Sequence, residues 1–586
     1  MKWDLSDLYR STKDLRVIKD LTQQLKRADS FSKKYRNKVK KFDITGLKKA
    51  LTEYENIQQE ASKPASFAHL LFSANTREHE HGALMQKTET ALIKLGNQLR
   101  FFELELIKIP EKRYNLFLKA KELRSWKHFL QKVVLFRKYR LSEREENIIE
   151  EKGATGARAW SRFFTQEHSN KKYPLKGFKN GAGESEVLKM LYDADRKKRI
   201  SAHQAFTAGL KEELPRSSFI FNTKLQDKYI NDQLLGYSFP ESSRHLDNEI
   251  SQKAVDALNL CVGKAFPIVH RYYQLKRKLL KIKSLYDYDR YAPLFPAKHI
   301  FSFSDAQKIV LDSFRKFSPE FCSVAKLFFD NRWIDVESRL GKSSGAFCAP
   351  VTPDTHPYIL LNFHGTARDV MTLAHELGHG VHMYLSRVNG YLTYQGPLTL
   401  AETSSVMGEL LVFDALMKKI KNPKEKLAFL SAKIEDVFST VFRQIAMFRF
   451  ERKIHEMFRS RGELSANDFN RFWRETQKEM FGSSLQLTRD YDLWWGYVSH
   501  FIHTPFYVYA YAFGQLLVFS LWGKYQKEGE AFIPKLIDLL RAGDSLAPRE
   551  LLGRININIE SDKFWNEGLK VIKDLVKEVQ VLSHSL

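Results

Sequence analysis

Two histidines and a glutamate within five consecutive residues could carry out metal chemistry. His375, Glu376 and His379 stand in the order His-Glu-x-x-His. Two histidines four residues apart on a helix project from one face, so their imidazoles can share one metal ion. Glu376 lies about 100° around such a helix from His375, which makes it a poor ligand but places it beside a metal-activated water. The spacing predicts a metal-dependent hydrolase with Glu376 as general base.

The residues around this motif predict a helix with one packed face. At about 100° per residue, His375, His379 and His382 fall within roughly 60° of arc. The opposite side carries the apolar residues Val370, Leu373, Leu377 and Tyr384. The alternative, a chance pair of histidines, does not explain this division into an imidazole face and an apolar face.

Glu402 can supply the third ligand. A catalytic zinc ion needs three protein ligands and one open position for water. The stretch 387–399 contains Asn-Gly and Gly-Pro pairs, so the chain can turn there, and apolar residues at helical spacing follow. Glu402 and Glu409 both lie on the inward stripe of this second helix, where an unpaired carboxylate would be strongly unfavourable. We therefore expect one Zn²⁺ per chain, held by Glu402 and the two motif histidines.

The same stretches carry a resemblance to a known family. The run GTARDVMTLAHELGHGVHMYL (Gly365 to Leu385), followed by LAETSSVMGELL (Leu400 to Leu411), is similar to the oligoendopeptidase F branch of the thimet-oligopeptidase-like zinc metallopeptidases. Further similar runs follow the same order along the chain: Ser142 to Phe164, Asp193 to Phe206, Phe328 to Pro350 and His503 to Gly514. The resemblance covers nearly the whole chain and implies the same zinc ligands and the same general base.

The resemblance also implies a fold. Members of this family are mainly α-helical, with two helical lobes enclosing a deep substrate channel and a gluzincin catalytic core. From the residues themselves, β-prone stretches from Ser344 to Ala349 and from Tyr358 to Phe363 flank a Pro-rich turn. They predict a small β-sheet next to the zinc helix.

A Lys-, Gly- and Asn-rich stretch from Ser169 to Glu184 makes the best domain boundary. We therefore expect an N-terminal helical lobe over residues 1–183 and a zinc metallopeptidase catalytic domain over residues 184–586. Within the first, an oligopeptidase F-type N-terminal region is expected at about 115–183.

An aromatic segment further along the chain offers donors for the oxyanion of the transition state. Tyrosine hydroxyls donate hydrogen bonds while staying neutral near pH 7, and similar enzymes use a His and a Tyr from a corresponding mobile segment. Tyr509 resembles that donor most closely, with His500 or His503 beside it. In a helix Tyr507 and Tyr511 share a face, whereas Tyr509 lies about 200° from Tyr507, so all three cannot face the metal. Packing in a core is the alternative.

Two other side chains are candidates for supporting the metal ligands. His382 lies on the imidazole face and could orient a ligand or the substrate, and Glu409 could accept a hydrogen bond from a ligand imidazole. Plain packing between helices is the alternative for both.

Substrate peptides could bind as an added strand, through main-chain hydrogen bonds that read little sequence. The candidates for this role are Gly345, Ala346, Phe347 and Cys348. His356 and Tyr358, at the end of the Pro-rich turn, could help to anchor the peptide. Cys348 is either a cleft residue or a buried inert thiol.

The composition of the chain bears on its degree of order, its cellular compartment and its association with membranes. With 586 residues, 43% of them hydrophobic, the chain can build an extensive core, which excludes global disorder. It has three cysteines, too few and too scattered for a disulfide framework, so we expect a reducing cytoplasm. No secretory signal or membrane-spanning stretch is readable, so no membrane partner is expected.

The net charge of +25 could attract a polyanion. However, basic and acidic residues alternate along most of the chain and no nucleic-acid-binding motif is present. Solvated helix faces are therefore the favoured explanation of the charge, with a functional polyanion-binding surface as the alternative, and no specific nucleic-acid partner is expected. The oligomeric state is left open.

These patterns favour a zinc-dependent endopeptidase (a hydrolase of the metalloprotease class, active in peptide metabolism) acting on short unfolded peptides. A metallo-carboxypeptidase has the same chemistry but needs a cationic clamp for the substrate's terminal carboxylate. A basic binding protein with an inert metal site is the alternative from another class. The presence of Glu376 argues against it, because a structural site needs no general base.

Overall fold

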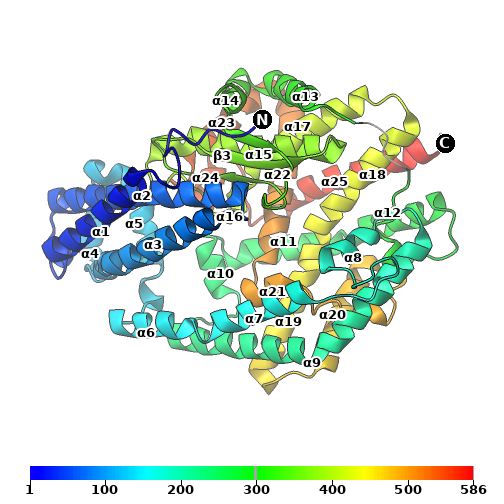
Figure 1. The fold of residues 1–586 in the computed structure, drawn as a ribbon, viewed down its shortest axis with the longest axis horizontal. Coiled ribbons are helices and arrows are strands. Elements are labelled where there is room, and N and C mark those ends of the chain that lie inside the picture. The colour runs from blue at the N-terminus through cyan, green and yellow to red at the C-terminus, as the bar shows by residue number, and fades with distance from the viewer. Residues whose placement is uncertain (296–299, 585–586) are drawn as a thin grey trace. The chain divides into compact units, whose positions relative to one another are not determined.

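The computed structural model describes residues 1–295 and 300–584, which form two compact units (Figure 1). The first consists of Met1–Glu143, His299–Leu416 and Lys524–Ile557, and the second of Arg144–Lys298, Met417–Gly523 and Asn558–Leu586. The predicted boundary after residue 183 lies inside the second unit, so it does not separate these two units. As a division into sequence domains it stays a prediction, as do the two lobes and the channel.

Helices dominate the first unit, which also holds the described strands. Its helices are α1 (Leu15–Tyr35), α2 (Ile44–Ala74), α3 (His79–Leu106), α4 (Glu111–Lys119), α5 (Lys127–Leu135), α13 (Phe303–Phe317), α14 (Pro319–Asp330), α15 (Ala367–Ser386), α16 (Leu398–Ala401), α17 (Thr403–Lys419), α23 (Ile533–Ala542) and α24 (Pro548–Gly553). Its strands are β1 (Ile334–Glu337), β2 (Phe347–Ala349) and β3 (Tyr358–Phe363).

The second unit is helical throughout its described part. Its helices are α6 (Glu143–Gly153), α7 (Ala157–Asn170), α8 (Glu184–Met190), α9 (Arg196–Leu235), α10 (Ser242–Asp247), α11 (Gln252–Lys264), α12 (Phe266–Leu279), α18 (Pro423–Thr440), α19 (Phe442–Arg461), α20 (Ala466–Phe481), α21 (Ser499–His503), α22 (Val508–Glu528) and α25 (Asp562–His584). Short 3-10 helices lie in both units: η1 (Val39–Lys41), η2 (Lys121–Trp126), η3 (Arg137–Tyr139), η4 (Asp287–Asp289), η5 (Arg387–Asn389), η6 (Asp490–Leu493) and η7 (Gly529–Phe532). The prediction of a mainly α-helical fold is confirmed.

The small sheet lies against the helix that carries the His-Glu-x-x-His motif. Its strand order is β1-β3-β2, with β2 antiparallel and β1 parallel to β3, and α15 contacts both β2 and β3. The predicted sheet is confirmed, with β3 at the expected bounds and β2 limited to its last three residues, after Gly345 at φ 79°. β1 was not predicted, because four residues are too few for an alternating pattern to stand out.

The N-terminal helices pack around an aromatic core. In Figure 1, α1, α2 and α3 lie side by side at the blue end of the chain, in agreement with their contacts. The ring of Phe102 lies 5.3 Å from that of Phe31 and 4.9 Å from that of Tyr54, centroid to centroid. Contacts of this kind bury large apolar areas, which explains how three long amphipathic helices hold together.

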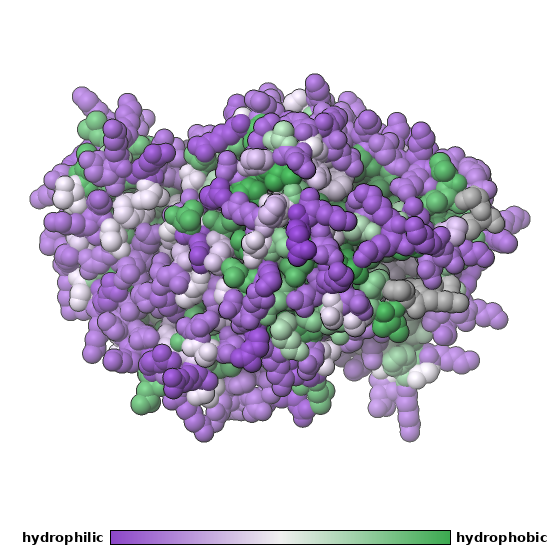
Figure 2. Space-filling model, turned by 90° about the horizontal axis from the view of Figure 1, so that it is seen from above, coloured by the Kyte–Doolittle hydropathy of each residue, from purple (hydrophilic) through white to green (hydrophobic). Residues whose placement is uncertain are grey.

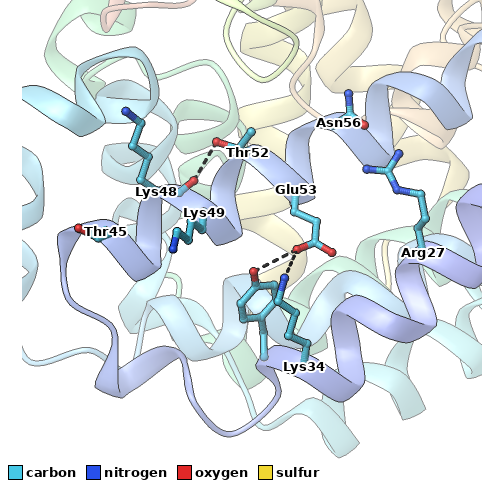
Figure 3. Close-up of a pocket in the computed structure, with 9 residues that line it drawn as sticks. Arg27, Lys34, Thr45, Lys48, Lys49, Thr52, Glu53 and Asn56 are labelled. Carbon is cyan, nitrogen blue, oxygen red and sulfur yellow. Dashed lines mark hydrogen bonds and ion pairs between the residues drawn. The ribbon is translucent and has the colours of Figure 1, made fainter.

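A groove between α1 and α2 is lined mainly by polar and basic side chains (Figure 3). Its carboxylate, Glu53, already accepts from the Nζ of Lys34 at 2.8 Å and from the hydroxyl of Tyr35 at 3.0 Å. Its lining includes no histidine, no cysteine and no second carboxylate. The groove therefore offers no set of residues for metal-dependent or acid–base catalysis.

The face of the molecule seen in Figure 2 is largely hydrophilic, with hydrophobic residues appearing between the polar ones. Within residues 1–295 and 300–584, no helix combines the length and the apolar character that crossing a bilayer requires.

Candidate metal centre

The motif helix α15 begins at a well-defined cap. Thr366 accepts a hydrogen bond from the backbone N–H of Asp369, and the Asp369 carboxylate accepts from the backbone N–H of Thr366 at 2.8 Å. This reciprocal pair satisfies two of the donors that every helix start leaves open. The helix then runs to Ser386 and carries both motif histidines on one face, as the sequence predicted.

Two glycines allow α15 and α17 to approach closely. A Cβ on Gly378 would lie 2.5 Å from the backbone oxygen of Ser404, and a Cβ on Gly408 would lie 2.8 Å from the backbone oxygen of Ala374. Such distances are too short for any larger residue. The Ser404 hydroxyl donates to the Gly378 carbonyl at 2.7 Å across the same contact. This close packing brings Glu402, between α16 and α17, to the histidines.

Three side-chain atoms converge at this point. The Nε2 atoms of His375 and His379 are 3.2 Å apart, and the Oε2 atom of Glu402 lies 3.3 Å from the first and 3.4 Å from the second. Their side chains are 25%, 15% and 35% exposed, so one side of the group is accessible. The structure thus brings together the three residues that the sequence predicted as ligands.

The triangle has the size that a tetrahedral metal requires. Ligand atoms about 2.0–2.1 Å from a tetrahedral ion lie about 3.3–3.4 Å from one another. The measured edges of 3.2, 3.3 and 3.4 Å fit this value. Two imidazoles and one carboxylate also form a donor set typical of catalytic zinc, whereas calcium and magnesium prefer oxygen ligands alone. The residues present therefore fit a bound zinc ion.

Glu409 orients one of the two imidazoles. Its Oε1 atom lies 2.6 Å from the Nδ1 of His375. When Nδ1–H donates this bond, the Nε2 lone pair points to the centre of the triangle. Burial alone would lower the pKa of His375, but the hydrogen bond and the charge of Glu409 outweigh it and raise that pKa to about 9. The contact predicted for Glu409 is therefore present.

Glu402 is held by Ser405, a contact that the sequence analysis missed. The Ser405 hydroxyl donates to Glu402 Oε2 at 2.7 Å. Burial raises the pKa of Glu402, but its hydrogen bonds and the charges of the histidines outweigh burial and lower that pKa to about 2. The carboxylate is thus ionised, as a metal ligand must be. A hydroxyl three residues after a candidate ligand was the signal for this contact.

Glu376 lies beside the triangle without belonging to it. Its side chain is 7% exposed, and burial raises the pKa of its carboxyl above the ordinary value. Burial, with a further contribution from the charge of Glu376, also raises the pKa of the Cys348 thiol on β2. Cys348 is therefore protonated and unreactive, and β2 lies close to Glu376.

His382 lies one turn beyond His379 and is buried. The backbone of Ala401, the residue before Glu402, lies near its ring. Burial, with the nearby charge of His379, lowers the pKa of His382 to about 4, so the ring is neutral. His382 thus links the motif helix to the residue that precedes Glu402.

The residues predicted to contact substrate fall into two groups. β2 forms one edge of the sheet, since its only strand partner in the described part of the chain is β3. Its residues Phe347 and Cys348, and Gly345 and Ala346 before them, are therefore placed where a peptide strand could add. Gly345 is exposed and its carbonyl accepts from the Asn362 amide at 2.9 Å.

His356 and Tyr358 lie in the interior instead. His356 is 8% exposed and its ring stacks on Trp333 at 3.7 Å, while Tyr358 has no exposed surface. His356 Nε2 also lies 2.9 Å from the Asp7 carboxylate. These placements argue against the predicted anchoring of a peptide, because neither side chain offers a surface to one.

In the second unit, the aromatic segment from His500 to Tyr511, called here the tyrosine segment, has a buried face and an accessible face. Tyr509 has no exposed surface, and its hydroxyl lies 3.0 Å from His245 Nδ1 and accepts from the Asn248 amide at 2.8 Å. This placement argues against its predicted role as oxyanion donor, because the hydroxyl is enclosed and already bonded.

His500, Tyr507 and Tyr511 lie together on the accessible face. The rings of Tyr507 and Tyr511 lie 5.0 Å apart, and the Nε2 of His500 is 3.2 Å from the Tyr511 hydroxyl. All three side chains are partly exposed. His503 is separate from them, with its Nε2 3.0 Å from the Thr165 hydroxyl on α7. Only the face of Tyr507 and Tyr511 can therefore offer a donor to a bound molecule.

Two buried or partly buried polar side chains, Glu451 and Arg244, fix the start of α22. The backbone N–H of Phe506 donates to Glu451 at 2.9 Å, and the Pro505 carbonyl accepts from Arg244 at 3.4 Å. Both sides of one peptide group are held in this way. Phe506 is left-handed, at φ 58°, a conformation that costs energy for a bulky residue and persists only where its surroundings enforce it.

Two protein-family models match this sequence. The sequence model of peptidase family M3 matches residues 189–571, and that of oligopeptidase F matches residues 105–171. An oligoendopeptidase F homolog of Lactococcus lactis is 25% identical over 99% of this chain and 97% of its own. Oligopeptidase PepF of Bacillus subtilis is 25% identical over 99% of this chain and 87% of its own.

Solved structures share the fold. A crystal structure from Chlamydophila abortus has a TM-score of 0.87 at 22% identity, covering 99% of this chain and 98% of its own. Oligoendopeptidase-F from Enterococcus faecium has a TM-score of 0.74 at 18% identity, covering 97% and 98%. The resemblance seen in the sequence is confirmed. Because the M3 family model spans more than half of the chain, the protein belongs to peptidase family M3 and is a metallopeptidase.

Proposed function

We propose that this metallopeptidase is a zinc-dependent endopeptidase that cleaves internal bonds of short, unfolded peptides. One observation carries the proposal: the triangle of His375, His379 and Glu402, with edges of 3.2–3.4 Å, suits a tetrahedral zinc ion. These three side chains would hold it. When bound, zinc supplies a Lewis acid that makes a water acidic and polarises the scissile carbonyl.

The residues of the chain supply the proton transfers. Glu376, beside the triangle, takes the proton of the attacking water and delivers it to the amine nitrogen that leaves. Glu409 keeps the Nε2 lone pair of His375 directed at the metal, and Ser405 steadies the ionised Glu402. His382 acts indirectly, by packing near the backbone of Ala401, the residue before Glu402.

The remaining donors come from the accessible face of the tyrosine segment. Tyr507 and Tyr511 are neutral donors suited to a developing oxyanion, and His500 is bonded to one of them. A substrate strand would pair with the free edge of β2, where main-chain hydrogen bonds leave the peptide sequence largely unread. Broad specificity for unfolded peptides follows from this mode of binding.

Three free cysteines suit a reducing cytoplasm as the place where the enzyme works. Short peptides are its proposed partners; neither a specific nucleic acid nor a membrane is needed for this activity.

A ladder of unfolded peptides with free or amidated C-termini tests the proposal. The protein is assayed as isolated, after chelation and after reloading with zinc, and every product is mapped by mass spectrometry. We expect internal cuts in both peptide series, lost on chelation and restored by zinc. Cuts confined to the last bonds of free-acid peptides would make it a carboxypeptidase. Turnover that survives complete removal of the metal would contradict the metal mechanism.

A further inference from the structure

Two arginines of the second unit, one buried and one partly buried, have no acidic partner in the described part of the chain. Arg290 follows η4 and is 3% exposed, and its Nη1 donates to the Tyr491 hydroxyl at 2.6 Å. Arg443, in α19, donates from Nη2 to the Tyr497 hydroxyl at 2.5 Å. Across residues 1–295 and 300–584, neither guanidinium forms an ion pair with a carboxylate. A buried charge is costly unless an opposite charge compensates it.

The surroundings of these guanidinium groups are aromatic rather than acidic. The rings of Tyr291 and Tyr491 lie 4.5 Å and 5.1 Å from the guanidinium of Arg290. The Nε atoms of both arginines are buried without a hydrogen-bond partner. Burial alone would raise the pKa of Tyr291, but the charges of Arg290 and Arg443 outweigh it and lower that pKa. The cluster is therefore a region of uncompensated positive charge.

Neighbouring charges are already paired. Glu435, whose charge also reaches Tyr291, accepts from the Lys276 Nζ at 2.5 Å and from the Tyr272 hydroxyl at 2.5 Å. On the same helix as Arg443, Arg449 pairs with Glu479 at 2.9 Å. Arginines on α19 thus find acidic partners where the chain provides them, and Arg443 does not.

The cluster is not sealed from outside. Arg443, Tyr291 and Tyr497 are all partly exposed, whereas Arg290 is 3% exposed, so an anion would approach the cluster on the side of Arg443. Arg443 also lies near His500, because its charge, after burial, contributes to lowering the pKa of that histidine. The positive cluster therefore adjoins the accessible face of the tyrosine segment within the same unit.

We propose that Arg290 and Arg443 form a subsite for the C-terminal carboxylate of the peptide substrate. The inference rests on the proposed peptidase function. A guanidinium matches a carboxylate in charge and in fork geometry. Every short peptide carries a terminal carboxylate whatever its sequence, so such a subsite recognises a chain end without reading side chains. It would give the enzyme a preference for short peptides that depends on charge.

Equilibrium binding to the Glu376→Gln protein tests the subsite without turnover. Three labelled peptides of one sequence are compared by fluorescence anisotropy: the free acid, the C-terminal amide, and the amide with a glutamate next to its end. We expect the free acid to bind about 10- to 100-fold more tightly than the plain amide, the range of charge-assisted hydrogen bonds. Adding Arg443→Gln should remove this difference, whereas Arg443→Lys should restore part of it.

Arg449→Gln is the matched control, since it removes an arginine of the same helix whose carboxylate partner lies within the chain. It should keep the preference for the free acid. Equal binding of acid and amide by the parent protein would overturn the proposal, as would an equal loss for both peptides in Arg443→Gln. If the glutamate-bearing amide binds as well as the free acid, the assignment to the chain end is wrong.

The parent comparison and Arg443→Lys keep the test decisive if Arg443→Gln fails to fold. Failure of the subsite is also distinguishable from failure of the proposed function. A protein that binds the free acid selectively but never cleaves a peptide after zinc loading would refute only the endopeptidase. A protein that cleaves internal bonds with no preference in binding would refute only the subsite.

Discussion

In the first unit, most of the metal centre follows from the spacing along one helix. His375 and His379 are one turn apart on α15, so their imidazoles must share a face once that helix forms. In the second unit, the tyrosine segment offers three hydroxyls over five residues, and helical spacing alone does not say which of them are accessible. Contacts with α10 determine which hydroxyls are accessible, because His245 and Asn248 enclose the hydroxyl of Tyr509.

The difference concerns what fixes a side chain. Within a helix, the relative directions of residues are covalent geometry, and they are known before any tertiary contact forms. Which face is then buried depends on neighbours that are distant in sequence, here residues 245 and 248 against 509. The relative placement of motif residues within one helix can therefore be predicted from the sequence. Which face of a largely apolar helix is exposed cannot be predicted in this way.

The largest effect is expected at the metal centre. Glu376→Gln should keep bound zinc, because Glu376 lies outside the triangle of ligand atoms. It should nevertheless lower kcat by roughly 10²- to 10⁴-fold, the usual contribution of a general base. Metal content and turnover are measured on the same preparation. A zinc-loaded variant with near-normal turnover would refute the role of Glu376.

Substitution of the tyrosines by phenylalanine should have different effects on the accessible and the buried face of the tyrosine segment. Tyr511→Phe, and Tyr507→Phe in parallel, should lower kcat with little change in KM, by up to about 10²- to 10³-fold for loss of an oxyanion donor. Tyr509→Phe should leave kcat close to normal. It should instead lower stability by about 1–3 kcal/mol, because the buried Asn248 amide loses its acceptor.

Steady-state kinetics and thermal unfolding of the three variants decide between the faces. A normal Tyr511→Phe and Tyr507→Phe beside a crippled Tyr509→Phe would restore the donor first predicted from the sequence. Normal turnover in all three would leave the whole segment with a packing role.

A smaller effect is expected one step outside the ligands. Glu409→Ala should weaken zinc binding about 10- to 100-fold, since it removes the acceptor that orients His375. Glu402→Ala should weaken it more, since it deletes a ligand. Zinc titration against a competing chelator measures both. Equal affinities in the two variants would mean that the triangle does not describe the ligand set.

The sequence predicted the fold class, the small sheet and the convergence of His375, His379 and Glu402. It also predicted the contact between Glu409 and an imidazole. The ligands and the Glu409 contact follow from periodicity and a burial argument within single helices. The sheet follows from two β-prone stretches around a Pro-rich turn, and the fold class follows from helical spacing together with the family resemblance. It did not predict Gly378 and Gly408 as the contact that sets Glu402 in place, because a glycine in a helix shows its purpose only against a partner backbone.

The arginine cluster lay outside the reach of sequence reasoning for a related reason. Arg290 and Arg443 are 153 positions apart, among 94 basic residues that mostly face solvent. Nothing local marks an arginine that will be buried beside tyrosines. Likewise, the Pro-rich turn before His356 and Tyr358 does not show which way these side chains face, and only the packing of Trp333 on His356 shows that they are interior.

A different effect, on stability rather than on turnover or metal binding, concerns the anchor of the tyrosine segment. Glu451 is buried and accepts from the Phe506 N–H, and burial raises the pKa of its carboxyl to about 8. Arg244 lowers this pKa and Glu241 raises it, and the neutral ring of His455 packs on Phe506. In the unfolded chain the carboxyl returns to its ordinary value of 4.5.

The sign of the pH dependence follows from this raised pKa. Below about pH 4.5 both states are protonated, and between there and about pH 8 only the unfolded state loses its proton, so stability falls as pH rises. Glu451→Gln keeps an acceptor for Phe506 but cannot ionise. Its Tm should therefore gain on that of the wild type from about pH 5 to about pH 8 and then stay ahead by a constant margin. Glu463→Gln, an exposed change in the same unit, should follow the wild type throughout. Calorimetry across this range measures the gap, and a gap that does not change with pH would show that Glu451 is ionised in the folded protein.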